Sequence, residues 1–413
     1  MVFILGGVQS DFARHLAREG GTLDTLVGET VDAVLEDAHL DVSAIEAIHV
    51  GNAFGELFTG QAQLGAMPAT ARPALWGVPA SRHEAACASG SMAILAAMAD
   101  IEAGRYACVL VLGVEQERNV PGDVGARHMG AAAWVGREGE GARYLWPHMF
   151  SRIADAYDER WGLRREHLVA IARKNLGNAR VNPAAQTRAW TWTDATLGDD
   201  DPANPVVEGR LRRHDCAQVT DGAAAVILAS PAFAEAHARH IGGPAGGRAH
   251  ARIAGWGHRT AALGLDAKLA RHTDPAQPLL PHARQAVADA LRRAELPDVR
   301  ALGGVEVHDC FTITEYLALD HLGLTAPGEA WKAIEAGITE KGGALPINPS
   351  GGLIGGGHPV GATGVRMLVD AARQVTGTAG PCQIEGARTF GTFNLGGSAT
   401  TVVSLIVAAP GPA

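Results

Sequence analysis

The strongest constraint on the fold is a pair of similar turns, each followed by small residues that predict a tightly packed helix. The first turn is Ala-Cys-Ala-Ser-Gly-Ser at 86–91, and Cys87 stands where the helix begins. The second is Gly-Gly-His-Pro-Val-Gly-Ala-Thr-Gly at 356–364, where His358 holds the same place. Helices made of such small side chains are typical of closely packed inner layers. If the turns face each other, a thiol meets an imidazole.

The order of predicted elements repeats along the chain. In the first part we expect strands at 2–5, 47–50, 80–86, 108–113 and 223–229, with helices from 22 and over 88–103. In the second part we expect strands at 251–254, 305–307, 383–389 and 400–407, a polar turn at 257–258, and helices over 282–295 and from 360 to about 375. This order predicts a duplicated α/β protein with two similar halves packed together.

A segment of different character interrupts the first half. Residues 119–213 are richer in Arg, Trp and His, lack strand alternation and contain a predicted helix over 166–179. We therefore expect a first half made of 1–118 and 214–232, an inserted domain at 119–213, and a second half at 250–413. The Pro/Ala/Gly/His-rich stretch at 231–250 is expected to be a linker.

Charge and cysteine content exclude several classes of protein. The 413 residues carry a formal net charge of −9 without a basic block, so nucleic acid and anionic membranes are not expected partners. No apolar run approaches the ~18 residues of a membrane span. The first residues lack the basic and apolar pattern of a secretory leader, so no such leader is expected. The five cysteines (87, 108, 216, 310 and 382) have no paired spacing, which favours free thiols in a cytoplasmic protein and no metal site.

Cys87 and His358 are candidates for a nucleophile and its base. By composition alone, Cys87 reads as a small core residue and His358 equally as a surface-loop residue. A helix N-terminus, however, offers unpaired N–H groups that favour a thiolate and stabilise an oxyanion on an acyl group held by the sulfur. The same position disfavours imidazolium at His358, so a neutral base is expected there.

Further polar residues follow the strand at 305–307, at the end where α/β sheets place ligands. His308 is a candidate donor to a carbonyl oxygen and Cys310 a second acid/base, while Asp309 is expected to orient a loop. The alternative is a capping Asp beside a packed Cys. Gly396, after Asn394 and Leu395, forms either a plain turn or a second oxyanion-hole N–H near Cys87. Cys108, Cys216 and Cys382 receive no catalytic role.

At these residues the chain resembles the thiolase superfamily, most closely the branch similar to sterol-carrier-protein-2-type thiolases and acetyl-CoA acetyltransferases. The resemblance covers essentially the whole chain. It rests on Cys-Ala-Ser-Gly-Ser at 87–91, His-Asp-Cys-Phe at 308–311, Asn-Pro-Ser-Gly-Gly at 348–352 and Gly-His-Pro-Val-Gly-Ala-Thr-Gly at 357–364.

The resemblance implies a five-layered α-β-α-β-α fold with two five-stranded halves and an inserted loop domain. It implies acyl transfer between coenzyme A thioesters of lipid metabolism through Cys87, with His358 as base. Coenzyme A would be a co-substrate, with no permanently bound cofactor. His308 and His358 would form one oxyanion hole, and the N–H groups of Cys87 and Gly396 the other. Most thiolases carry a further late Cys about where Asn394 stands here, so Cys310 takes the α-carbon proton role.

Other readings remain open. A ketoacyl-synthase-like enzyme or a retro-aldolase has the same fold, and the latter would not need Cys87. An inactive scaffold subunit is the non-enzyme alternative, against which the set Cys87, His308, Cys310 and His358 argues. The resemblance further implies a homodimer or homotetramer, and it leaves room for a small zinc-ribbon/OB-fold partner protein.

Overall fold

The computed structural model describes residues 1–242, 250–271 and 274–410. The strands of the first half are β1 (Val2–Gln9), β2 (Ala47–Gly51), β3 (Ala80–His83), β4 (Cys108–Glu115) and β7 (Gly222–Ala229). Those of the second half are β8 (Ala251–Thr260), β9 (Val305–Val307), β10 (Thr389–Gly396) and β11 (Thr401–Ala408). Together they form a nine-stranded sheet in the order β3-β2-β4-β7-β1-β8-β11-β10-β9.

The strand order shows the predicted duplication. From the join between β1 and β8, the two halves run outward in the same pattern. In the first half β7 is antiparallel to both β1 and β4, and β4, β2 and β3 are parallel. In the second half β11 is antiparallel to both β8 and β10, and β10 and β9 are parallel. The join consists of three residue pairs, from Val2 with Ile253 to Ile4 with Ala251. In the second half the fifth strand is reduced to a single parallel bridge between Val305 and Ile347, so the expectation of five full strands there is wrong.

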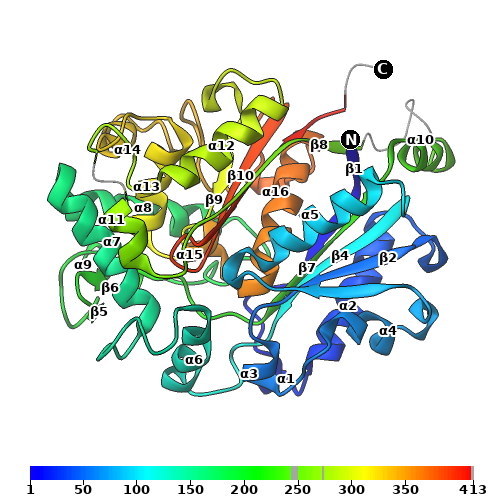
Figure 1. Cartoon of the computed structure of the whole chain (residues 1–413), viewed down its shortest axis with the longest axis horizontal. Helices are drawn as coiled ribbons and strands as arrows, with labels where there is room; N and C mark the ends of the chain where they lie inside the picture. Colours follow the sequence, from blue (N-terminus) through cyan, green and yellow to red (C-terminus); the bar gives the residue numbers. More distant parts are fainter. Residues whose placement is uncertain (243–249, 272–273, 411–413) are drawn as a thin grey trace.

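The helices complete five layers (Figure 1). Helices α5 (Ser89–Glu102) and α16 (Thr363–Thr376) share one apolar core with the inner faces of both sheet halves. Helix α2 (Leu23–Asp37) covers the outer face of the first half, and α12 (Pro281–Arg293) and α13 (Thr312–Leu322) cover that of the second. This α-β-α-β-α arrangement confirms the predicted fold class.

Small residues allow the inner layers to approach closely. A Cβ atom on Gly51 would lie 2.6 Å from the Cα of Gly90, and one on Gly90 would lie 2.7 Å from the carbonyl oxygen of Gly361. Neither distance is compatible with a side chain, so strand β2 and helices α5 and α16 meet backbone to backbone. The glycines around the two turns therefore have a packing role as well as a conformational one.

The inserted segment is mainly helical. It contains α6 (Gly122–Met129), α7 (Leu145–Trp161), α8 (Arg165–Ala179), α9 (Asp194–Leu197) and a small hairpin of β5 (Val206–Glu208) and β6 (Leu211–Arg212). Although it interrupts the first half in sequence, α7 and α8 pack into the core of the second half. Lys174 of α8 donates to Glu315 of α13 over 2.5 Å, and both side chains are buried.

The remaining helices are short. They are α1 (Leu16–Glu19), α3 (Gly55–Thr59), α4 (Met67–Ala71), α10 (Pro231–His240), α11 (Leu265–Arg271), α14 (Ala330–Glu335) and α15 (Gly352–Gly356). Among the residues that the structure describes, no helix has the length and apolarity that crossing a bilayer requires.

Several predicted boundaries are wrong. The supposed linker at 231–250 begins with helix α10, started by Pro231 and capped by the Ser230 hydroxyl; its part at 243–249 lies outside the described residues. The polar turn at 257–258 is a continuous part of β8, because β11 pairs with that strand from Arg252 to Thr260. The strand predicted at 383–389 begins only at Thr389. The strand at 80–86 ends at His83, which leaves room for the turn before Cys87.

Candidate active site

Cys87 lies in a strained turn at the N-terminal end of α5. The turn is the short 3₁₀ segment Ala86–Ala88, and Ala86 has a φ of +50°, a left-handed conformation that costs a residue with a Cβ about 1–2 kcal/mol. The Ser89 hydroxyl holds the turn, since it accepts from the Ala85 N–H over 2.9 Å and donates to the Ala86 carbonyl over 2.6 Å. The turn presents the thiol to a cavity.

His358 stands between α15 and α16. Its backbone N–H donates to the Thr220 hydroxyl over 2.8 Å, and its ring Nδ1 lies 2.7 Å from the Thr363 hydroxyl. Because that hydroxyl donates to the Pro359 carbonyl, it accepts from Nδ1–H. This network assigns the tautomer of the neutral ring and leaves the Nε2 lone pair for a proton.

His308 follows the C-terminal end of β9 and is oriented by Asn394 of β10. Nδ1 of His308 lies 3.0 Å from Oδ1 of Asn394. The Asn394 amide nitrogen donates to the Ser91 hydroxyl over 2.9 Å and to the Cys87 carbonyl over 3.2 Å. Asn394 therefore accepts from His308, whose Nε2 also carries a lone pair. The same amide ties β10, the strand that pairs with β9, to the turn that carries Cys87.

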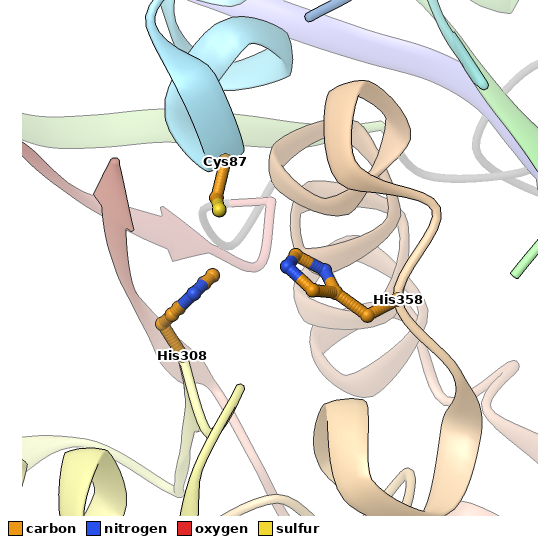
Figure 2. A group of neighbouring side chains, drawn as sticks. All are labelled: Cys87, His308 and His358. Carbon is orange, nitrogen blue, oxygen red and sulfur yellow. The ribbon is translucent and has the colours of Figure 1, made fainter. Parts of the chain in front are cut away.

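The two turns bring their reactive side chains together with His308. One side-chain atom each of Cys87, His308 and His358 lie within 4.8 Å of one another. Figure 2 shows the thiol pointing between the two imidazoles, whose centroids are 5.1 Å apart at an interplanar angle of 81°. This spacing suits proton exchange, and a sulfur with two ring nitrogens would also suit a soft metal ion. Cys87 comes from the first half and both histidines come from the second.

Burial keeps all three groups uncharged. It lowers the pKa of His308 to about 3 and the pKa of His358 well below its ordinary value. Burial raises the pKa of Cys87 to about 12, and the nearby Glu117 carboxyl acts in the same direction. The amides of Cys87 and Gly397 offset only part of this rise. Burial thus outweighs the thiolate-favouring effect of the helix N-terminus, and the free site favours a thiol beside two neutral imidazoles, as a base that takes the thiol proton requires.

The second amide at Cys87 belongs to Gly397, one residue beyond the predicted Gly396. The Gly397 N–H stabilises the sulfur, together with the N–H of Cys87 itself. Gly396 has a packing role, because a Cβ there would collide with the Ala85 carbonyl oxygen. Gly397 adopts a φ of +60°, which glycine accepts without strain. This residue directly follows the end of β10 and lines the cavity.

Cys310 and Asp309 lie on opposite sides of the loop after β9. Cys310 lines the same cavity as Cys87, and its Sγ lies 3.6 Å from the Thr314 hydroxyl. Burial, and then the nearby Cys87, raise the pKa of Cys310 well above its usual range. Asp309 points away from the cavity and accepts from the backbone N–H groups of Leu353 and Ile354 at the start of α15. Its carboxyl thus positions the loop before His358.

The cavity has a volume of about 330 Å³ and is mostly apolar. Residues from both halves and from the inserted segment line it, including Phe54, Cys87, Glu117, Met129, Trp146, Phe150, Cys216, Cys310, Phe311, His358, Val360 and Gly397. Two of these, Glu117 and Cys216, carry ionisable side chains that the sequence analysis did not place at the site. Glu117 follows the carboxyl end of β4, a position that signals a site in α/β sheets. Cys216 has no local signal, because a backbone bond from Ala217 to Cys310 brings it there.

Comparison with known proteins gives a consistent relationship. Residues 2–189 match the family described as "Thiolase, N-terminal domain", and residues 267–409 match "Thiolase C-terminal domain-like". An acetyl-CoA acetyltransferase of Methanothermobacter thermautotrophicus is 31% identical over 91% of this chain and 92% of that protein. Human sterol carrier protein 2 is 28% identical over 98% of this chain and 71% of its own length.

Solved structures share the fold at lower identity. A structure described as "Ltp2-ChsH2(DUF35) aldolase" superposes with a TM-score of 0.79 at 23% identity, over 100% of this chain and 98% of that chain. Acetyl-CoA acetyltransferase from Syntrophomonas wolfei gives a TM-score of 0.70 at 17% identity, over 98% of each chain. Sequence matches in both halves, together with this architecture, establish that the chain belongs to the thiolase family.

Proposed function

We propose that the protein is a thiolase-type acyltransferase, which holds an acyl group as a thioester on Cys87 and exchanges it between coenzyme A thioesters. The observation that carries the proposal is the convergence of Cys87, His308 and His358 within 4.8 Å at the cavity. The relatives named acetyl-CoA acetyltransferase support the same reaction class.

The neutral site suits attack coupled to proton transfer. In the cleavage direction, the Cys87 sulfur bonds to the 3-keto carbon of a 3-ketoacyl-CoA while its proton passes to Nε2 of His358. The Nε2–H of His358 then donates to the developing oxyanion. Nε2 of His308 also carries a lone pair, so this ring can accept a second proton. Once protonated, Nε2–H of His308 donates to a carbonyl oxygen of the substrate. Proton transfers of this kind contribute ~10²–10⁴-fold each.

The remaining steps use Cys310 and the two amides. The bond between C2 and C3 then breaks. The leaving group is the enolate of acetyl-CoA or propionyl-CoA, which takes a proton from the Cys310 thiol, and the rest of the acyl chain stays on Cys87. The N–H groups of Cys87 and Gly397 face the carbonyl oxygen of the acyl group now held by sulfur. The thiol of a fresh coenzyme A attacks this thioester, releases the second acyl-CoA product and returns a proton to Cys87. The proton that His358 took up passes to Cys310, so both thiols and the neutral imidazole are restored. The reverse sequence is a Claisen condensation.

The central test is whether acyl-CoA acylates Cys87. Mass spectrometry of the peptide carrying Cys87 should detect the acyl group, and a panel of 3-ketoacyl-CoAs should show thiolysis. Cys87→Ala should abolish both activities, whereas Cys310→Ala should retain acylation and lose carbon–carbon bond chemistry. Absence of acylation with every acyl-CoA tested would contradict the proposal, and full thiolysis by Cys310→Ala would contradict the role of Cys310.

Retro-aldol cleavage is the second candidate, supported by the fold shared with the aldolase structure. Such a reaction would not form a thioester on Cys87, so alkylation of this residue separates the two functions. Iodoacetamide should abolish activity, and acyl-CoA should protect the enzyme. Cleavage of substrate that continues after complete alkylation of Cys87 would favour retro-aldol chemistry.

Assembly and location are part of the proposal. The aldolase structure includes a DUF35 protein, which supports a small partner for this chain as well. We also infer a cytoplasmic homodimer or homotetramer. Light scattering of the purified chain tests its self-association, and purification of the tagged chain from its own cells tests the partner. A monomer that acts alone would contradict both inferences.

A further inference from the structure

Glu117 is a buried carboxylic acid in the cavity wall that the reaction above does not use. Its side chain is 2% exposed and lines the same cavity as Cys87. Neither carboxyl oxygen has a hydrogen-bond partner of good geometry. Within the described part of the chain, Glu117 supplies the only carboxyl among the residues that line this cavity. A buried polar group without a partner requires an explanation, because such groups are ordinarily satisfied.

The position of Glu117 is fixed by its backbone. The N–H of Glu117 donates to Oδ1 of Asp221 over 2.7 Å, and the next N–H, of Arg118, donates to the same oxygen over 2.8 Å. Asp221 also accepts from the N–H of Leu16 over 3.0 Å, so its carboxylate is fully engaged. The carboxyl of Glu117 is therefore held at the cavity by a rigid turn and is not a mobile surface group.

The surroundings favour the protonated form of Glu117. Two other buried carboxyls, those of Glu115 and Asp221, face it, and burial is the main cause that raises its pKa well above the ordinary value. The amides of Val360 and Thr220 offset part of this rise. Glu117 also faces the Cys87 sulfur, where a negative charge would oppose thiolate formation. Among the described residues, the O–H group of this acid has no hydrogen-bond acceptor of good geometry.

Most of the cavity wall offers that proton no acceptor. Close to the reactive side chains the wall consists mainly of apolar groups such as Phe54, Met129 and Val360. An apolar acyl chain would leave the acid unsatisfied, at a cost in binding, whereas an oxygen on the chain would accept its hydrogen bond. Buried polar groups of this kind discriminate most strongly against substrates that lack the matching group.

We propose that Glu117 is a specificity-determining residue, which donates a hydrogen bond to an oxygen substituent, a hydroxyl or carbonyl, on the acyl group of the substrate. This oxygen is additional to those that react at Cys87, and the inference rests on the proposed acyl transfer. The chemical class expected is therefore an oxygenated acyl-CoA in preference to a plain alkyl one.

Pairs of matched substrates test this inference. Each pair consists of two 3-ketoacyl-CoAs of equal length, one with a hydroxyl at a chosen carbon of the acyl tail and one with a methyl at that carbon. The ratio of their kcat/KM values is measured as the substituent is moved along the chain. The wild-type protein should prefer the hydroxyl by about tenfold or more at one position. A flat ratio along the whole chain would overturn the inference and mean that Glu117 holds only water.

Two variants assign the preference to the carboxyl. Glu117→Gln keeps a donor and should retain part of the preference, whereas Glu117→Met, of similar volume, should lose or reverse it. Cys216→Ala changes another side chain of the same wall and should leave the ratio unchanged. An equal ratio in wild type and Glu117→Met would overturn the proposal, and thermal unfolding identifies a variant that has failed to fold.

A binding measurement separates this inference from the proposed function. In Cys87→Ala, which cannot form the thioester, calorimetry compares the dissociation constants of the same two acyl-CoAs with and without Glu117→Met. A preference that depends on Glu117 supports the subsite even if acylation of Cys87 is never detected. Acylation without any preference in kinetics or binding overturns the subsite and leaves the acyltransferase proposal intact.

Discussion

Oδ1 of Asn394 lies 3.0 Å from Nδ1 of His308, while the amide nitrogen of the same Asn394 donates to the Cys87 carbonyl. One side chain therefore sets the tautomer of a site histidine and ties it to the turn of the nucleophile. In the expected thiolase pattern a reactive cysteine stands near this position. The exchange of a thiol for an amide turns a chemical role into a positioning role.

Asn394→Ala should lower kcat by about 10–100-fold with a smaller change in KM, because His308 loses its orientation but the cavity remains. Asn394→Asp has the same shape and places a carboxylate at Nδ1, so it should raise the pKa of His308. This rise should appear as a new ionisation in the pH profile of kcat. Steady-state kinetics from pH 5 to 9 check both outcomes, and a wild-type profile in Asn394→Asp would contradict the contact.

Cys87 should rest as a neutral thiol in the free protein and react with alkylating agents through the small fraction present as thiolate. Its pKa of about 12 means that the thiolate fraction rises about tenfold per pH unit through the whole range from 6 to 9. His308, with a pKa of about 3, stays neutral over this range and supplies no stabilising charge. The rate of iodoacetamide alkylation of Cys87 should therefore increase with a slope near one and without a plateau. A plateau near pH 7 would instead indicate a preformed thiolate–imidazolium pair.

Gly90→Ala should destabilise the protein by about 3 kcal/mol, because the new Cβ would lie 2.7 Å from the Gly361 carbonyl oxygen. Gly177→Ala is the matched control, since Gly177 lies within α8 and a Cβ there meets no atom within 4 Å. It should stabilise the protein by about 0.5–1 kcal/mol through helix propensity. Chemical denaturation measures both changes, and equal effects would argue against backbone contact between the inner helices.

Lys174→Met should cost about 3–5 kcal/mol, because it leaves the buried Glu315 carboxylate without its cation. Lys332→Met removes an exposed pair with Glu329 and should change stability by less than about 0.5 kcal/mol. The double variant Lys174→Met/Glu315→Leu should recover part of the loss, since it removes the unpaired charge as well. A loss in the double variant equal to the sum of the two single losses would contradict the coupling.

The duplicated order and the meeting of the two turns could be predicted because both depend on local signals. The small residues at 86–91 and 356–364 indicate the start of a buried helix at each place, and apolar runs indicate the inner strands. The five-layer arrangement and the grouping of Cys87 with His358 follow from those signals and from the resemblance to thiolases.

Features that depend on tertiary environment could not be predicted. The rise in the pKa of Cys87 results from burial by residues that are distant in sequence, and it outweighs the effect of the helix end, which is local. The helix at 231–240 lies in a composition typical of a linker, and the fifth strand of the second half fails because only Ile347 pairs there. Gly396 is the predicted source of the second amide at Cys87, but Gly397 supplies it. This difference of one residue depends on where β10 ends, which the sequence does not define that closely.

The origin of the site in both halves has a consequence during translation. The Cys87 turn is synthesised well before His308, His358 and Asn394, which lie in the last third of the chain. Before the second half has been synthesised and has folded, Cys87 lacks the two histidines and the part of the cavity wall that this half supplies. We therefore expect the thiol to be more open to oxidation or alkylation in that interval than in the folded chain.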